Sequence, residues 1–187
     1  TLFTTPPYSL FNPDIARDEN VGQQQYRWVE YYKMNYDMAW YMEVVNKLVL
    51  AMRAHYGFIG RYNDKMPYSP FERFLLGGNG LTGFNFLLGS DVIGLRGYAN
   101  NSIGPSTFSR DASQVANGGV IFNKYVAEFR YPISLNQMAT VYVLTFFEGG
   151  NNFLNHSEYN PLLLKSSVGV GARIFMPAFG MIGVDYG

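Results

Sequence analysis

The sequence predicts an all-β fold, part of an antiparallel, up-and-down transmembrane β-barrel. Apolar side chains alternate with small or polar ones along most of the chain, which is the period of a β-strand. The alternating segments exceed an average globular strand and reach the roughly nine to eleven residues that cross a bilayer at a tilt. Short and long connections also alternate, as in barrels with tight turns at one end and long loops at the other.

The clearest alternating segment covers residues 47–59. Its odd positions include Arg53 and His55, whereas its even positions are apolar. We therefore expect the odd positions to face the barrel lumen and the even ones to face lipid. The expected lipid-facing side chains are Leu48, Leu50, Met52, Tyr56 and Phe58.

The other predicted strands follow the same rule. Along residues 25–41, tyrosine, tryptophan and methionine share one face, interrupted by Glu30, while Lys33 lies on the other. The remaining strands are expected at residues 119–131, 139–148, 165–176 and 180–187, and from the first residue to about Phe11. Aromatic side chains at the ends of the apolar bands suit interfacial girdles, namely Tyr26, Trp28, Trp40 and Tyr41.

The connections predict a topology. Long connections at about 12–24, 61–118 and 149–164 are expected on the extracellular side. Short turns near 42–46, 132–138 and 177–180 are expected on the periplasmic side. The loop at 61–118 is far longer than an ordinary connection, and loops of that length usually carry a function or are disordered.

Composition narrows the function classes. The 187 residues carry 14 basic and 14 acidic side chains, so the formal net charge of zero argues against a nucleic-acid partner. The chain has no cysteine, and of its two histidines His55 is expected in the lumen and His156 in a loop, so no metal site is predicted. Residues 78–83 match G-x-G-x-x-G without a following helix, and we predict neither a cofactor nor an enzyme.

A soluble β-sandwich also alternates, with one apolar face turned inward. The polar faces here are rich in glycine and serine and poor in charge, unlike a solvated exterior, and the apolar faces are long and aromatic. These features favour the membrane barrel. About seven strands with open edges cannot close by themselves, because lipid leaves unpaired backbone groups unsatisfied, so further strands are expected.

One basic residue stands out in the long loop. Arg96 lies in a glycine-rich, nearly uncharged stretch, where its guanidinium needs a carboxylate, a phosphate or water as a partner. By alternation, Glu128 shares the lumen face of its strand with Lys124 and Arg130. Three short motifs follow one another along the chain: Leu95-Arg96-Gly97-Tyr98, then Glu128 shortly before Pro132, then Phe147-Glu148-Gly149-Gly150.

These motifs, in this order, resemble the C-terminal part of the barrel in the BamA family, the central subunits of the outer-membrane β-barrel assembly machine. The family carries V/L-R-G-F/Y at the tip of its sixth extracellular loop, and an aromatic-acid-x-glycine motif in which aspartate is commoner than the glutamate found here. The likeness runs from about residue 25 to the end. It implies a barrel of about sixteen strands, of which residues 1–187 hold about seven, without the N-terminal half-barrel, the POTRA domains or the aromatic-ending last strand.

The resemblance implies that Arg96 folds into the lumen and meets Glu128 and Glu148. The loop and lumen contact is expected to involve Leu95, Arg96, Gly97, Tyr98, Glu128, Glu148 and Gly150. The implied function is the insertion of β-barrel proteins into the bacterial outer membrane without covalent chemistry. The implied partners are unfolded outer-membrane proteins, accessory lipoproteins of the assembly machine and the lipid bilayer.

Two other functions fit an outer-membrane barrel. A TamA-like or two-partner-secretion translocator shares the arginine loop and serves other clients. A passive porin conducts steadily through an open lumen, whereas a barrel filled by its long loop conducts little.

Overall fold

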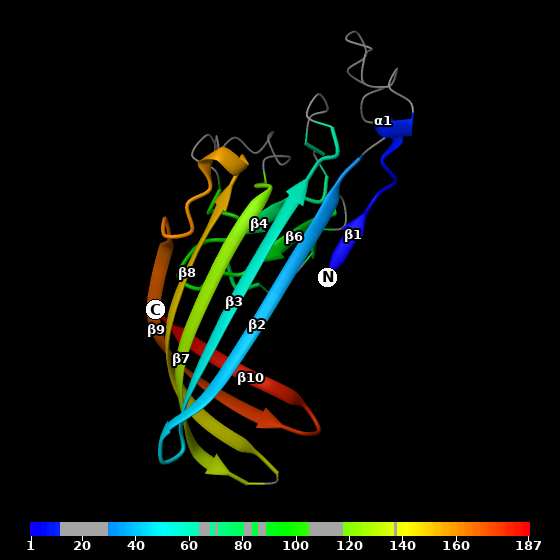
Figure 1. Cartoon of the computed structure of the whole chain (residues 1–187). Coiled ribbons are helices and arrows are strands. Elements are labelled where there is room, and N and C mark those ends of the chain that lie inside the picture. The colour runs from blue at the N-terminus through cyan, green and yellow to red at the C-terminus, as the bar shows by residue number, and fades with distance from the viewer. Residues whose placement is uncertain are drawn as a thin grey trace.

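The computed structural model describes residues 1–11, 30–63, 68–69, 71–80, 84–85, 89–104, 118–136 and 138–187. Its main feature is a sheet of seven antiparallel strands in the order β1-β2-β3-β7-β8-β9-β10 (Figure 1). The strands are β1 (Leu2–Thr4), β2 (Tyr32–Val45), β3 (Leu48–Gly60), β7 (Ile121–Leu135), β8 (Thr140–Phe153), β9 (Lys165–Met176) and β10 (Gly180–Tyr186). The predicted antiparallel, up-and-down order is therefore confirmed. Among the described residues, no helix is long and apolar enough to cross a membrane.

Tight turns join the strands at one end of the sheet, and long connections lie at the other (Figure 1). The turn between β2 and β3 consists of Asn46 and Lys47, which both have positive φ, as two-residue hairpin turns of type I′ require. On which side of a membrane each end lies stays a prediction.

Several strands end later than the sequence indicated. β2 and β7 both continue into the residues that were expected to form turns. Each strand contains a register shift, between Glu43 and Val45 in β2 and between Pro132 and Ser134 in β7, and pairing resumes beyond it. A bulge is one of the few places where a sheet tolerates a proline. β8 extends to Phe153, so the motif of Glu148 lies inside the strand.

The first strand is shorter than predicted. β1 ends at Thr4 because Pro6 and Pro7 cannot donate backbone hydrogen bonds, and a short helix, α1 (Tyr8–Phe11), follows. Glu30 precedes β2 and is buried, where its carboxylate accepts hydrogen bonds from the backbone N–H and the hydroxyl of Ser9. It therefore does not interrupt a strand face. Tyr26 and Trp28 lie outside the described residues.

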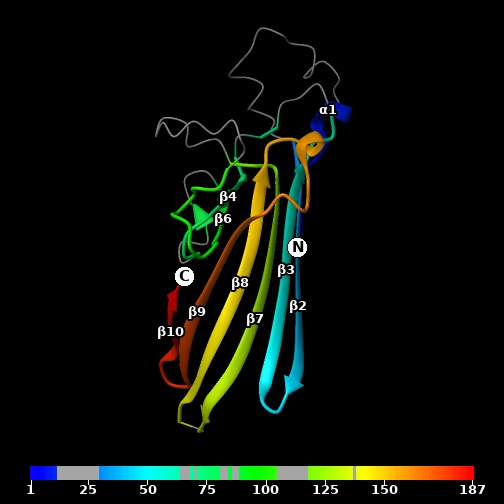
Figure 2. The same ribbon diagram turned by 90° about the vertical axis from the view of Figure 1, so that its left-hand side faces the viewer.

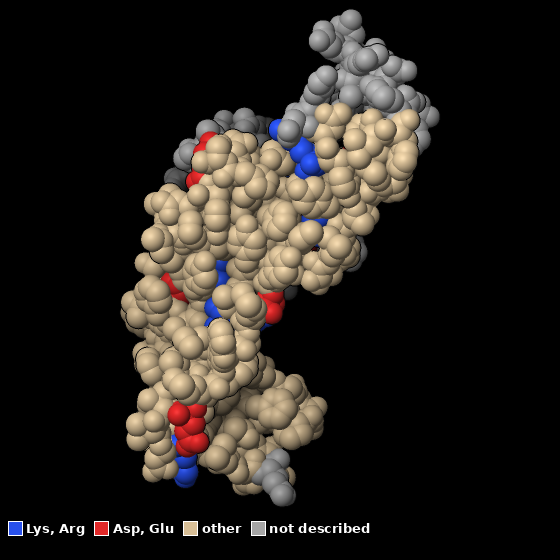
Figure 3. Space-filling view, viewed as in Figure 1, with Lys and Arg blue, Asp and Glu red and all other residues tan. Residues whose placement is uncertain are grey.

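The sheet has two chemically different faces. We call the face covered by the chain between β3 and β7 the inner face, and the opposite one the outer face. Most of the surface in view is uncharged, and the charged atoms form small separate groups at the upper end, at mid-height and near the lower turns (Figure 3). The exposed side chains of the outer face include Tyr36, Met38, Trp40, Met52, Tyr125, Phe129, Phe147, Val168, Val170 and Val184. Tyr41, expected in an aromatic girdle, instead lines the inner face near the guanidinium of Arg130.

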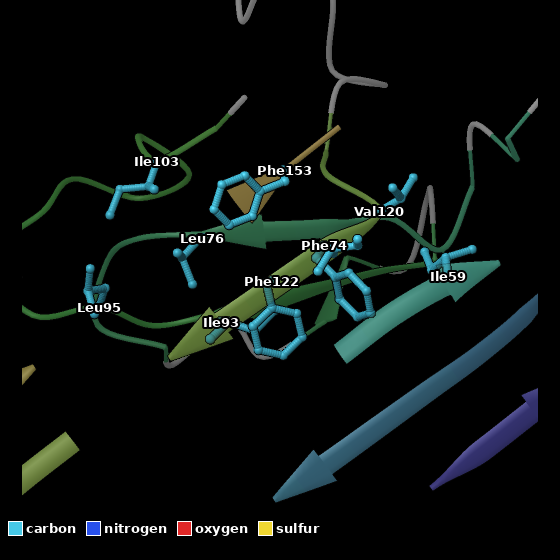
Figure 4. Close-up of a cluster of buried hydrophobic side chains, with 10 residues drawn as sticks. Ile59, Phe74, Leu76, Ile93, Leu95, Ile103, Val120, Phe122 and Phe153 are labelled. Atoms are coloured by element: carbon cyan, nitrogen blue, oxygen red, sulfur yellow. The ribbon is translucent and has the colours of Figure 1, made fainter. Parts of the chain in front are cut away.

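The chain between β3 and β7 is here named the inner loop (residues 61–120), and its described residues fold against the inner face. It contains a small sheet in which β6 (Ser90–Ile93) pairs with β4 (Phe74–Leu76) in parallel and with β5 (Phe84–Asn85) in antiparallel fashion. In the edge-on view, β4 and β6 lie on one side of the large sheet (Figure 2). A buried apolar cluster joins this loop to the ends of the strands (Figure 4) and contains Ile59, Phe74, Leu76, Ile93, Leu95, Ile103, Val120, Ile121, Phe122 and Phe153.

The connection between β8 and β9, here named the strap (residues 154–164), follows the opposite side of the sheet (Figure 2). It contains a single 3₁₀ turn, His156–Glu158. The rings of Tyr159 and His156 lie against Tyr56 and Phe58. The prediction that Tyr56 and Phe58 face lipid is therefore wrong: both point to the outer face, but the strap covers them.

Candidate functional site

The candidate site lies where the tip of the inner loop meets β7 and β8. The backbone of the loop turns at Gly97, whose φ of +81° is open to glycine and strained for other residues. A Cβ at this position would also lie 3.1 Å from the Cβ of Ser167 on β9. Glycine therefore lets the loop approach the wall closely and turns Arg96 toward it.

Arg96 binds two carboxylates from neighbouring strands. Its Nε donates to Glu148 Oε1 at 2.6 Å, and its backbone N–H donates to the other oxygen of that carboxylate at 3.0 Å. One Nη donates to Glu128 Oε1 at 2.5 Å. The structure thus brings Arg96, Glu128 and Glu148 together, and the planar guanidinium suits this task because its donors are fixed in a fork.

The groups around Arg96 stabilise its guanidinium in the charged form. Burial alone would lower the pKa of Arg96, but its hydrogen bonds to Glu148 and Glu128 outweigh burial and raise that pKa. Below the guanidinium lies the ring of Phe146, with Cζ 3.8 Å from the ring centroid, which adds a cation–π contact.

Further charged groups extend this cluster beyond the predicted residues. Lys124 of β7 lies 3.5 Å from Glu148 and donates to the carbonyl of Gly94 at 2.6 Å. Arg130 donates to the second oxygen of Glu128 at 2.7 Å. Alternation had placed Lys124 and Arg130 on the lumen face with Glu128, but it could not pair them.

Asp185 of β10 is a residue that sequence reasoning missed. Its carboxylate lies 3.6 Å from Nη1 of Arg96 and 2.6 Å from Nη1 of Arg173 on β9. The cluster therefore reaches from β7 to β10. The signal in the sequence was the alternation of Asp185 with Val184 and Tyr186, which places it on the inner face.

The other predicted residues support the position of the loop tip. Leu95 is fully buried in the apolar cluster, and the hydroxyl of Tyr98 donates to the carbonyl of Ser166 at 2.9 Å. Gly150 leaves room for the loop, since a Cβ there would lie 3.5 Å from Leu76 and 2.8 Å from the carbonyl of Asn123.

A second ionic cluster fixes the inner loop to β2. Lys33 is 1% exposed, and its ammonium lies 3.0 Å from Asp91 and 3.1 Å from Glu72, both in the loop. Asn35 donates to the same Asp91 carboxylate at 3.2 Å, and the ring of Phe74 lies under the ammonium. Alternation placed Lys33 inward, but nothing in the sequence identified its partners.

The fold and these contacts can be compared with known proteins. The sequence matches the Omp85 superfamily domain over residues 15–187. The chain belongs to the Omp85 superfamily. A search of curated protein sequences finds no match.

Omp85 proteins are β-barrel proteins of the bacterial outer membrane, and the superfamily includes BamA, TamA and secretion translocators. The antiparallel sheet is therefore a portion of an Omp85 barrel wall. Its outer face, with few charges and many exposed aromatic and aliphatic side chains, is the face that such a wall turns to lipid. The inner loop and the Arg96 cluster lie on the lumen side.

Proposed function

We propose that this Omp85 protein assembles and inserts β-barrel proteins into the bacterial outer membrane, as a BamA-type insertase that performs no covalent chemistry. The proposal is carried by Arg96, which links the inner loop to Glu128 of β7 and Glu148 of β8. A loop held at this point supports the wall from within. Client strands can then pair with a sheet edge of the barrel by backbone hydrogen bonds, as exposed strand edges permit.

The cost of removing one partner from the Arg96 ion pairs indicates that this arginine stabilises the position of the inner loop. Removing one partner of a desolvated ion pair costs about 3–5 kcal/mol, and less where water reaches the charges. The side chain of Arg96 is 18% exposed, and those of Glu128 and Glu148 are 9% and 3% exposed, so most of that cost applies. Loss of Arg96 should therefore loosen the loop while the strand pairing that forms the wall persists.

A passive porin is the alternative from another functional class. The inner loop covers the lumen side of the described sheet and buries its own apolar cluster there, which favours a barrel that conducts little. The proposed partners are unfolded outer-membrane proteins as clients, with accessory lipoproteins of the assembly machine.

The test uses the complete protein reconstituted into phospholipid vesicles. The measured quantity is the rate at which a urea-denatured outer-membrane barrel folds into the same vesicles, scored by the different gel mobility of folded and unfolded protein in unheated samples. We expect acceleration by the wild type, strong loss with Arg96→Ala and partial recovery with Arg96→Lys, because an ammonium cannot bridge both carboxylates in a fork. Glu148→Gln should resemble Arg96→Ala, and the double variant should be less than additive.

Arg53→Ala is the matched control, because Arg53 pairs with Asp37 on the same inner face but stays largely exposed. It should retain the wild-type rate. A wild-type protein that accelerates no client contradicts the insertase proposal and favours a translocator. Steady, large conductance across the same vesicles favours the porin, and full activity of Arg96→Ala refutes the role of the arginine.

A further inference from the structure

The strap covers polar positions on the mostly apolar outer face. Asn123 and Asn151 pair across β7 and β8 and share the outward face with Tyr125 and Phe147, yet both are buried. Asn123 Nδ2 donates to the carbonyl of Pro161 at 3.0 Å, and Asn151 Nδ2 donates to the carbonyl of Leu163 at 2.8 Å. Without the strap, two side-chain amides would lose these partners at the edge of the lipid layer, where an unpaired polar group is unfavourable.

The strap packs against successive outward-facing residues of β8. Next to the asparagines, β8 carries Gly149 on its outer face, and the side chain of Leu164 lies 3.3 Å from where a Cβ of that glycine would be. Nearer the long-loop end, Tyr159 packs on Phe153 with ring centroids 5.3 Å apart. The strap therefore covers the outer face of β8 from Gly149 to Phe153.

The surface that the strap presents outward is aliphatic. Leu162 is 85% exposed and Leu163 is 58% exposed. Local hydrogen bonds hold this corner in shape: the backbone N–H groups of Leu162 and Leu163 donate to the side-chain and backbone oxygens of Asn160, and that of Leu164 donates to the carbonyl of Leu162. An ordered backbone that projects two leucines continues the apolar surface that begins at Phe147 and Val168.

The height of the apolar belt brings lipid to this corner. From Ala127 to Leu135, β7 has nine residues below the strap. The eight steps between them, at about 3.3 Å each and a tilt near 40°, rise about 20 Å. The apolar band of an outer-membrane barrel is about 25 Å tall. The missing height corresponds to about two residues of strand, so the band ends near the row of Tyr125 and Gly149, where Leu164 packs, next to the row of the two asparagines.

We propose that the strap is a lipid-contacting element that inserts Leu162 and Leu163 among the acyl chains of the leaflet on the long-loop side. Its backbone carbonyls bind the amides of Asn123 and Asn151 at the edge of the hydrocarbon. The occupant is lipid because the leucines continue the outer belt of an Omp85 barrel wall. The proposal depends on the barrel fold and is independent of whether the protein inserts clients.

The test places a single cysteine carrying a bimane fluorophore at position 162, 168 or 158 of the complete protein, with any other cysteine replaced. The 187 residues contain none, so the labels are specific within this region. Each variant is reconstituted into dioleoylphosphatidylcholine vesicles and quenched separately by brominated phosphatidylcholine and by aqueous iodide. Val168, which is 70% exposed on the belt, is the lipid control, and exposed Glu158 is the aqueous control.

We expect the label at Leu162 to behave like that at Val168, with strong quenching by brominated lipid and little by iodide. Quenching like that of Glu158 would overturn the proposal, and protection from both quenchers would overturn it in favour of a protein partner. In a second set, Asn151→Ala should shift the Leu162 label toward iodide and leave the Val168 label unchanged. An unchanged Leu162 label in that variant would refute the role of Asn151 in binding the strap.

Discussion

Replacing Lys33 by methionine should release the inner loop from β2 without unfolding the wall. The change removes a charge that is almost fully buried and leaves Asp91 and Glu72 without their cation. Breaking a fully buried pair costs about 3–5 kcal/mol. Because the two carboxylate side chains keep 28% and 31% of their surface exposed, we expect about 2–3 kcal/mol after discounting for solvent screening.

The loss should appear as faster amide hydrogen exchange in the loop. Each 1.4 kcal/mol is about a factor of ten in an opening equilibrium, so exchange in β4 and β6 should rise roughly thirty- to a hundredfold. Peptides that cover β8 serve as the internal reference, because its ladder with β7 does not include Lys33.

Arg53→Met is the matched control for Lys33→Met. Arg53 also forms an ion pair on the inner face, but it and its partner Asp37 are 59% and 41% exposed, and such pairs contribute about 0–1 kcal/mol. Exchange in the loop should therefore rise by at most about fivefold. Equal acceleration by the two substitutions, or equal acceleration in β8, would refute the reasoning that burial makes Lys33 an anchor of the loop.

Three other outcomes are expected. Gly97→Ala should destabilise the loop tip by about 1–2 kcal/mol, because its φ is left-handed, seen as faster exchange around that residue. Asn152→Ala should lower the free energy of unfolding of the barrel by about 1–3 kcal/mol, measured by thermal denaturation, because the buried amide donates to the carbonyl of Phe74 at 2.7 Å. In intact cells, a membrane-impermeant thiol reagent should label a cysteine at Asn160 and spare one at Asn136; the reverse pattern inverts the topology.

The repeating parts of the structure were predictable from the sequence. Alternation with a period of two placed Lys33, Lys124 and Glu128 on one face, because successive side chains of a strand point to opposite sides. The pairing of Arg96 required the family resemblance in addition, since parity says which face a glutamate occupies and not which loop residue reaches it.

Features made by a single contact could not be read from the pattern. Glu30 looked like a break in a strand, but its position follows from its hydrogen bonds to Ser9, far away in sequence. The position of the strap could not be predicted for the same reason. Tyr56 has the parity of a lipid-facing residue, but the ring of Tyr159 packs against it. The outward asparagines were the available signal, since an amide at a lipid-facing position needs a partner.

The inner loop also has a consequence for the order in which the chain folds. Tight turns close the pairs β2–β3, β7–β8 and β9–β10, and the strap closes β8–β9. By contrast, about sixty residues separate β3 from β7. By the logarithmic dependence of closure entropy on length, joining them costs about 3 kcal/mol more than closing a tight hairpin.

We expect part of that cost to be met within the loop before the two strands join. Phe74 of β4 and Gly119 exchange both backbone hydrogen bonds, at 3.0 and 2.9 Å, next to the bond between Ile59 and Val120 that begins the β3–β7 ladder. A folded loop therefore holds the start of β7 beside the end of β3, and the two long strands can zip from there. We therefore expect the loop to act as a folding template for the pairing of β3 with β7.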